Sequence, residues 1–196
     1  FANSAAAYTM TVNVTADNKP PLVTAGATLA YSESQVATAI DATITVSDVE
    51  NDSITGATIT ISSNYIVGQD ALSFTYTSGG NITGLFDIPT GVLTLSGTRS
   101  VAEYQLALRS VTYDNSNDDN PVAGNRTISY VVNDGADDSS AVTSTVTVTA
   151  VNDAPIMNST TLQSSLNMQM NDTNPDTLDG TAITFGADFT DVDGAG

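Results

Sequence analysis

The feature that most constrains this chain is an internal repeat, in which a strand-like segment and the linker after it occur twice. Residues 11–23 align with residues 145–157 at a shift of 134, and seven of the 13 aligned positions are identical. A second match, residues 48–50 against 191–193, follows in the same order at a shift of 143. Self-similarity of this kind is typical of stacked structural units. The chain is therefore predicted to be a row of similar domains.

The two matches divide the chain into three parts. Residues 1–19 are interpreted as the last strand of one repeat, 20–154 as a complete repeat and 155–196 as the start of a following repeat. A chain of 196 residues has room for one full-sized sandwich domain with parts left over, or for two small domains, and the division from the repeat favours the first.

Apolar and polar residues alternate through the central repeat, and this predicts strands with one buried face. The alternating apolar positions are Ala42, Ile44 and Val46; Ala57, Ile59 and Ile61; Leu72, Phe74 and Tyr76; Leu93 and Leu95; Val111 and Tyr113; Ile128, Tyr130 and Val132; Val142, Val146 and Val148. Turn signals, such as residues 78–81 and 133–135, separate these runs. Seven or more short strands at this spacing favour an all-β, Ig-like sandwich.

One segment departs from the alternation. Ser100 and Glu103 have the spacing of a capping box, and Val101, Tyr104 and Leu108 follow at helical spacing. A short helix is therefore predicted over residues 101–109, crossing between the two sheets.

The composition excludes several classes of function. The chain has 22 acidic and four basic residues, a net charge of −18, with no histidine and no cysteine. Because so acidic a chain cannot neutralise phosphates, DNA and RNA are not expected partners. No apolar run is long enough for membrane insertion. Disulfides and ordinary zinc, iron or copper sites lack their ligands.

Acidic residues follow a predicted strand in a pattern that suits calcium. Asp48, Glu50 and Asp52 stand at alternate positions, and Asp191 and Asp193 recur at the second match. Two carboxylates about 4 Å apart repel by roughly 4 kcal/mol at an effective dielectric constant near 20. Calcium, which takes six to eight oxygen ligands, is the natural ion to neutralise them. An ordinary polar turn is the alternative, and the recurrence favours a metal.

The linker supplies further oxygen atoms. Asn152 and Asp153 stand immediately before residues 154–155, Ala-Pro, on a segment that the proline keeps extended. A cation held there would contact both neighbouring domains. A plain inter-domain hinge is the alternative interpretation.

These segments resemble the cadherin-like tandem repeats of giant bacterial surface adhesins. The resemblance rests on the acidic motif, on residues 90–97 leading into 101–113, on residues 132–135 and on the Val-Asn-Asp-Ala-Pro linker. It covers the whole chain, and the linker and the Asn-Asp-Gly turn are its more specific parts. It implies Ig-like or cadherin-like β-sandwich repeats strung end to end, calcium (Ca2+) at the joints, and export to the cell surface or a secreted matrix.

Carried over by position, the resemblance implies two sets of metal ligands. At the downstream joint they are Asn152, Asp153, Asp191 and Asp193; at the upstream joint they are Asp17, Asn18, Asp48, Glu50 and Asp52. Lys19 stands where Asp153 would be matched, so the upstream joint is expected to bind metal more weakly, or through Asp17. Asp134 is either a further ligand or the tip of a hairpin turn. The pair Asp137 and Asp138 is interpreted as a solvated loop.

The leading prediction is a calcium-rigidified structural or adhesive repeat of an extracellular surface protein. It is not an enzyme, and its partners are neighbouring repeats of the same protein. One alternative is a filament subunit in which a strand near residues 6–16 completes a neighbouring copy's sheet. A carbohydrate-binding module is the second, and the absence of tryptophan argues against it. Glycoside hydrolysis by a carboxylate pair is disfavoured because the acids lie on turns beside linkers.

Overall fold

The computed structural model describes residues 9–13, 17–50, 53–76, 81–153, 156–157 and 189–190. In chain order the elements are β1 (Leu22–Thr24), β2 (Thr28–Ser32), β3 (Thr38–Ala39), β4 (Thr45–Ser47), β5 (Ser53–Ser63), β6 (Asp70–Phe74), β7 (Thr83–Asp87), β8 (Val92–Ser100), α1 (Val101–Arg109), β9 (Val111–Asn115), β10 (Gly124–Asn133), β11 (Val142–Thr149), β12 (Ile156–Met157) and β13 (Phe189–Thr190). No helix in this part of the chain is both long and apolar enough to cross a membrane.

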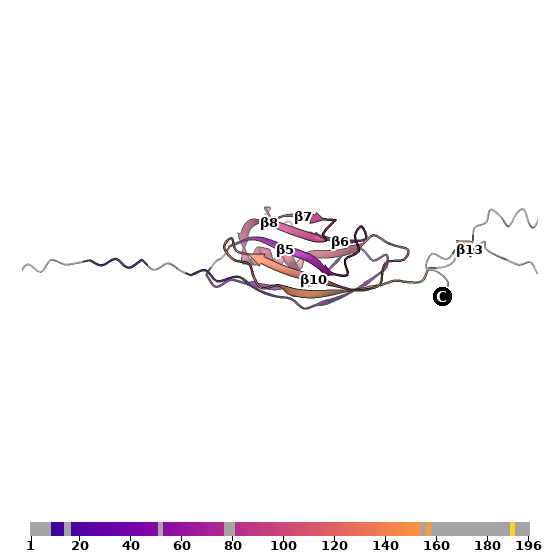
Figure 1. Ribbon diagram of the computed structural model, residues 1–196, viewed down its shortest axis with the longest axis horizontal. Coiled ribbons are helices and arrows are strands. Elements are labelled where there is room, and N and C mark those ends of the chain that lie inside the picture. Colours follow the sequence, from indigo (N-terminus) through magenta and orange to yellow (C-terminus); the bar gives the residue numbers. More distant parts are fainter. Residues whose placement is uncertain are drawn as a thin grey trace, which may run out of the picture.

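The strands form two packed layers (Figure 1). One layer is a six-stranded sheet in the order β2-β11-β10-β5-β8-β7, and the other is made by the β3-β9-β6 and β1-β4 sheets together with α1. All pairings are antiparallel except that of β2 with β11. The predicted all-β, Ig-like class is confirmed.

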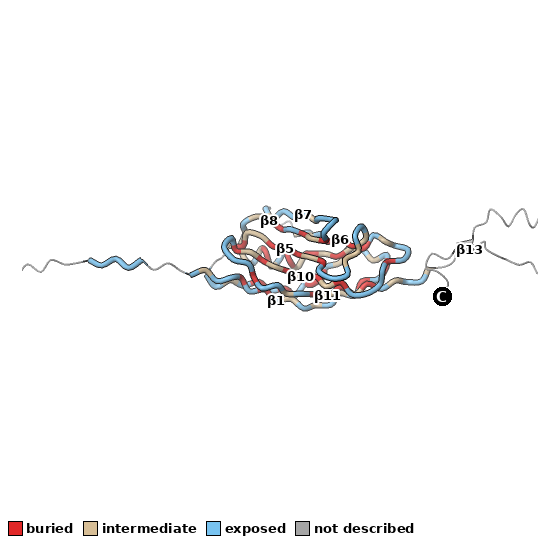
Figure 2. The backbone as a smooth tube through the Cα atoms, in the orientation of Figure 1, coloured by how far each residue is buried: buried red, intermediate tan, exposed pale blue. Residues whose placement is uncertain are grey.

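The core fills the space between the layers, where Figure 2 shows the buried residues. Among the described residues, every buried apolar side chain of the core lies between Val23 and Val148. This segment therefore encloses a core of its own. Most alternating positions point inward as predicted, whereas Ala42 is exposed because it lies in the turn before β4.

The turn that displaces Ala42 is built around a buried carboxylate. Asp41 is only 1% exposed. Its Oδ1 accepts the Thr43 N–H at 2.8 Å and the Thr43 hydroxyl at 2.6 Å. Its Oδ2 accepts the N–H groups of Gly26 and Ala27, both at 3.0 Å, and the Ser144 hydroxyl at 2.8 Å. Burial by itself would raise the pKa of Asp41, but these five hydrogen bonds outweigh it and hold the pKa well below the usual range.

Asp41 should therefore make stability depend on pH. Its depressed folded-state pKa means that its contribution is present above the unfolded value, about 3.9, and is lost as the pH falls through and below it. Asp41→Asn is expected to lower the free energy of unfolding by about 1–3 kcal/mol at pH 7, because an NH2 group then faces buried donors. Urea titrations at pH 7 and pH 3 should show a smaller difference from wild type at pH 3. An undiminished difference there would contradict this account.

The predicted helix is confirmed with its cap. Ser100 accepts the Glu103 N–H, and the Glu103 carboxylate accepts the Ser100 N–H, so both halves of the capping box are present. The helix connects β8 of the large sheet to β9 of the small one, and Tyr104 and Leu108 reach the core. The Tyr104 hydroxyl donates to the Gly97 carbonyl at 2.6 Å, which satisfies a buried polar group.

The pairing of β12 with β13 has the register that the internal repeat requires. In the central domain Leu22 pairs with Ser47 and Val23 with Val46. Shifted by 134 and 143 residues, these pairs become 156 with 190 and 157 with 189, and those are the pairs that β12 and β13 form. The exact domain boundaries stay a prediction, but the strand pair that opens the repeat occurs twice.

Candidate functional site

The chain enters and leaves the sandwich at opposite ends. Residues 17–21 lead into β1 at one end, and residues 150–153 leave β11 at the other (Figure 1). We call these the upstream and downstream ends. β4 ends at the upstream end, because Ser47 pairs with Leu22 there. Of the nominated residues that the structure describes, Asn18 and Asp48 lie at the upstream end, and Asn152 and Asp153 lie at the downstream end.

The turn after β10 forms the centre of the upstream end. Asp134 is 5% exposed, and its Oδ1 accepts the N–H groups of Ala136 at 2.7 Å and Asp137 at 2.8 Å. Gly135 has φ of 104°, a conformation that favours glycine. Asp134 thus lies in the turn between β10 and β11, and the turn uses only its Oδ1 as a hydrogen-bond acceptor.

The other oxygen of Asp134 faces the upstream linker. The Asn18 amide donates to Asp134 Oδ2 and to Asp137 Oδ2, both at 2.9 Å. The Asp137 N–H and then the Asn18 amide hold the pKa of Asp134 below its usual range. Asp137 is exposed, as predicted, but it also contacts the linker. The nominated residues Asn18 and Asp134 are thus brought together.

Asp48 and Asp17, two further upstream candidates, have recorded partners outside this cluster. Asp48 Oδ1 accepts the Glu50 N–H at 3.1 Å, so Asp48 organises its own turn after β4. Asp17 forms an ion pair with Lys19 at 2.5 Å between Oδ2 and Nζ. The Asp17 carboxylate is therefore already paired with a cationic side chain. Asp52 lies outside the described residues.

The downstream end contains an acidic residue that the sequence interpretation missed. Glu33 follows β2 and is 9% exposed. Its Oε2 accepts the Val151 N–H at 2.7 Å, and its own N–H donates to the Thr149 carbonyl at 2.9 Å. Its Oε1 is buried without a hydrogen-bond partner among the described residues. A buried, unpartnered carboxylate oxygen is costly, and a cation would relieve that cost.

Glu33 fixes the linker where the nominated ligands begin. Asn152 and Asp153 follow Val151 directly, and the Asn152 amide donates to the Asp153 carbonyl at 2.8 Å. Both side chains are at least partly exposed. Asp191 and Asp193, their predicted partners, lie outside the described residues. Among the residues that the structure describes, no three acidic side chains converge closely enough to form a metal centre.

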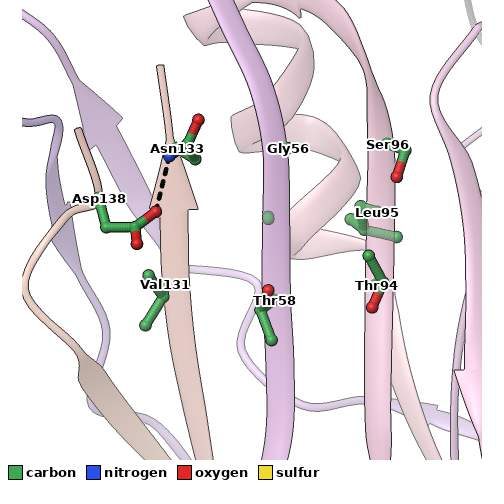
Figure 3. Close-up of a pocket in the computed structure, with 9 residues that line it drawn as sticks. Gly56, Thr58, Thr94, Leu95, Ser96, Val131, Asn133 and Asp138 are labelled. Carbon is green, nitrogen blue, oxygen red and sulfur yellow. Dashed lines mark hydrogen bonds between the residues drawn. The ribbon is translucent and has the colours of Figure 1, made fainter. Parts of the chain in front are cut away.

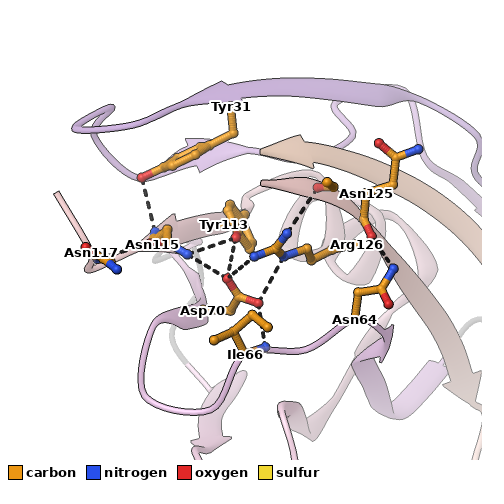
Figure 4. A network of polar contacts seen from close by, with 10 residues as sticks. Tyr31, Asn64, Ile66, Asp70, Tyr113, Asn115, Asn117, Asn125 and Arg126 are labelled. Atoms are coloured by element: carbon orange, nitrogen blue, oxygen red, sulfur yellow. Dashed lines mark hydrogen bonds and ion pairs between the residues drawn. The ribbon is translucent and has the colours of Figure 1, made fainter. Parts of the chain in front are cut away.

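A buried ion pair lies in the core near the downstream end (Figure 4). Arg126 Nε is 3.1 Å from Asp70 Oδ2, and the two side chains are 1% and 0% exposed. Asp70 Oδ1 also accepts the Tyr113 hydroxyl at 2.5 Å and the Asn115 amide at 2.7 Å. The Ile66 N–H donates to Asp70 Oδ2 at 2.8 Å. These contacts satisfy the Asp70 carboxylate and tie β6, β9, β10 and the loop before β6 together.

The network around this pair continues to β2, the strand that Glu33 follows. The Asn115 N–H donates to the Tyr31 hydroxyl at 3.1 Å (Figure 4). That hydroxyl in turn donates to the Gln35 carbonyl. The rings of Tyr31 and Tyr113 meet edge to face at 4.9 Å. Glu33 lies between Tyr31 and Gln35 in the chain, so its backbone is anchored on both sides.

A shallow depression of about 260 Å³ lies on the large sheet at Gly56, where β5 has no side chain (Figure 3). Thr58, Thr94 and Val131 are among its lining residues, and Asp138 there accepts the Asn133 amide at 2.7 Å. None of the nine described residues that line it is aromatic. It therefore offers no stacking surface for a sugar ring.

The fold and the two ends define a class, an all-β sandwich domain that the chain enters and leaves at opposite ends. The chain is similar to Halomucin, a large surface protein of the archaeon Haloquadratum walsbyi, with 35% identity over 130 residues. The match covers 65% of this chain but 1% of Halomucin, so the chain spans only a small part of that relative. No protein-family model and no solved structure matches the chain. The cadherin-like assignment stays a prediction.

Proposed function

We propose that this domain is a structural repeat of an extracellular surface protein, joined head to tail to similar repeats and stiffened by calcium at the junctions. The observation that carries the proposal is that the chain enters and leaves the domain at opposite ends, and that acidic or amide side chains lie at each of these ends. The domain transmits force and sets spacing, and it performs no chemistry. The likeness to a surface protein supports an extracellular location.

The downstream junction has the stronger case for calcium. Glu33 Oε1 is a buried oxygen without a described partner, which fits a hard cation that prefers oxygen ligands. Asn152 and Asp153 add side-chain oxygens within two residues of Val151, which Glu33 holds. Asp191 and Asp193 belong to the following repeat in the proposed arrangement. A cation shared between them would replace mutual repulsion by a common attraction.

The test is a calcium titration of the whole chain. Calcium at ten times its dissociation constant stabilises the folded state by about 1.4 kcal/mol per site. Chelation is therefore expected to lower the melting temperature by about 5 °C for a domain of this size. Small-angle scattering should show a shorter and more flexible chain after chelation. An unchanged melting temperature and unchanged dimensions would contradict the calcium part of the proposal.

Salt controls are essential because of the net charge of −18. Any salt screens repulsion between exposed carboxylates, so a gain in stability alone does not identify calcium. Sodium chloride at matched ionic strength measures this general screening. Magnesium chloride tests whether the sites prefer calcium to magnesium, since Mg²⁺ demands a smaller, near-octahedral site and loses water reluctantly. A calcium effect that exceeds both would support specific sites.

A further inference from the structure

Four valines are exposed in the loops of the downstream end. Val36, Val67, Val122 and Val151 are 80%, 62%, 50% and 52% exposed. Single exposed apolar residues are ordinary, but loops normally favour glycine, proline and small polar residues. Four branched aliphatic side chains from four separate segments at one end call for a physical explanation.

Hydrogen bonds between the segments place these valines at the same end. The Ser34 hydroxyl donates to the Asp118 carbonyl at 3.4 Å, which joins the loop of Val36 to that of Val122. The Ser116 hydroxyl donates to the Gly68 carbonyl at 3.1 Å, which joins the loop of Val67 to the same segment. Val151 is joined to the first loop by its own bond to Glu33.

The linker determines what lies next to this end. Four residues separate Val151 from Ile156, where β12 begins. A fully extended chain spans at most about 3.6 Å per residue, so β12 begins within about 18 Å of Val151. The pairing of β12 with β13 repeats the register of β1 with β4, so this strand pair corresponds to the one at the upstream end of the central domain.

The upstream end of the central domain also carries exposed apolar side chains. Leu22 is 64% exposed and Val49 is 88% exposed. Leu22 pairs with Ser47, two residues before Val49, so both lie at the upstream end. By the repeat alignment their counterparts in the next repeat are Ile156 and Val192, which are also apolar.

We propose that the downstream valines Val36, Val67 and Val122 form one half of an inter-repeat contact with the upstream end of the following repeat. The residues at the positions of Leu22 and Val49 form the other half. This inference rests on the head-to-tail arrangement of the proposed function but not on calcium. A short linker holds the two surfaces at a high effective concentration, so the following repeat outcompetes any free partner. Burial of the aliphatic groups opposes the repulsion between acidic domains.

The test uses a tandem of two domains with the natural linker, residues 17–155 continued directly into residues 22–153. The alignment puts the second copy in register, and each copy has its own core. A neutral nitroxide in solution relaxes exposed valine methyl groups, and its lack of charge avoids bias from the acidic surface. In calcium-free buffer the methyls of Val36, Val67 and Val122 should lose at least half of this relaxation in the first copy relative to the second.

Substitutions in either copy provide the matched control. The double substitution Val36→Ser and Val67→Ser in the first copy should broaden the distribution of inter-domain distances derived from small-angle scattering. The same two substitutions in the second copy should leave that distribution unchanged. Equal methyl exposure in both copies, or equal effects of the substitutions, would overturn the contact. A tandem that keeps the contact but whose stability and dimensions do not respond to calcium would instead contradict calcium stiffening. Failure of the inter-repeat contact and failure of calcium stiffening are therefore distinguishable.

Discussion

Replacing Arg126 by methionine is expected to lower the free energy of unfolding by about 3–5 kcal/mol. Methionine keeps the volume and the apolar stem of the side chain but leaves the Asp70 carboxylate buried without its cation. Three hydrogen bonds to that carboxylate persist, from Tyr113, Asn115 and Ile66. They offset part of the loss but do not neutralise the charge. Urea unfolding at pH 7, followed by circular dichroism, measures the difference.

Arg99 provides a matched control. It also pairs with a carboxylate, that of Glu103, which lies 3.9 Å away and four residues further along the chain, but these side chains are 27% and 29% exposed. Pairs that solvent reaches contribute only about 0.2–1 kcal/mol. Arg99→Met removes the same charge from the chain and is expected to have an effect below about 1 kcal/mol. A similar loss of unfolding free energy in Arg126→Met and Arg99→Met would show that burial does not determine how much each ion pair contributes to stability.

A double variant separates the lost cation from the lost packing. Asp70→Asn in the Arg126→Met background removes the uncompensated charge while an amide oxygen still accepts from Tyr113 or Asn115. The double variant is therefore expected to be more stable than the sum of the two single effects predicts, with a coupling energy of about 0.5–3 kcal/mol. Additive losses would contradict a direct interaction between the two side chains.

Much of this core could be predicted from alternation alone, including the inward position of each of its two charged side chains. Arg126 lies two residues before Ile128 on the inward ladder of β10, and Asp70 lies two residues before Leu72 on β6. Asn115 likewise follows Tyr113 on β9. The parity of these positions indicates inward-facing side chains, but strand alternation does not say which strands meet. Pairing the two charges needed the sheet order.

The ends of the domain were less predictable than its core. The linker and turn motifs drew attention to Asn18 and Asp134, which the structure brings together, because local sequence sets the geometry of the turn. Glu33 carries no motif of its own, and it became visible only through its distance to Val151, 118 residues away in sequence. The one local signal was its spacing: Glu33 lies two residues after Tyr31, which is 1% exposed, so alternation predicts that Glu33 also faces inward. Contacts that depend on a parallel pairing of distant strands are invisible to local patterns.

Glu33→Gln is expected to separate the calcium response from the stability of the apo domain. The glutamine carbonyl oxygen can still accept the Val151 N–H, and its NH2 group replaces the buried oxygen that has no described partner. Without calcium the variant should be as stable as wild type or slightly more stable, because a buried charge is removed. Calcium affinity at the downstream end should fall at least about tenfold, since even outer partners of metal ligands account for about 10–100-fold.

The control for this variant is Asp119→Asn, which makes the same change of charge at the same end. Asp119 is exposed in the segment between β9 and β10. If calcium acts only by screening, both variants should reduce the calcium-induced rise in melting temperature equally. If Glu33 binds the ion, only Glu33→Gln should do so, and isothermal titration should show the loss as a missing or weakened site. A Glu33→Gln protein that keeps the full calcium response would mean that the linker is fixed by the Val151 hydrogen bond alone. Glu33 would then position the linker without binding metal.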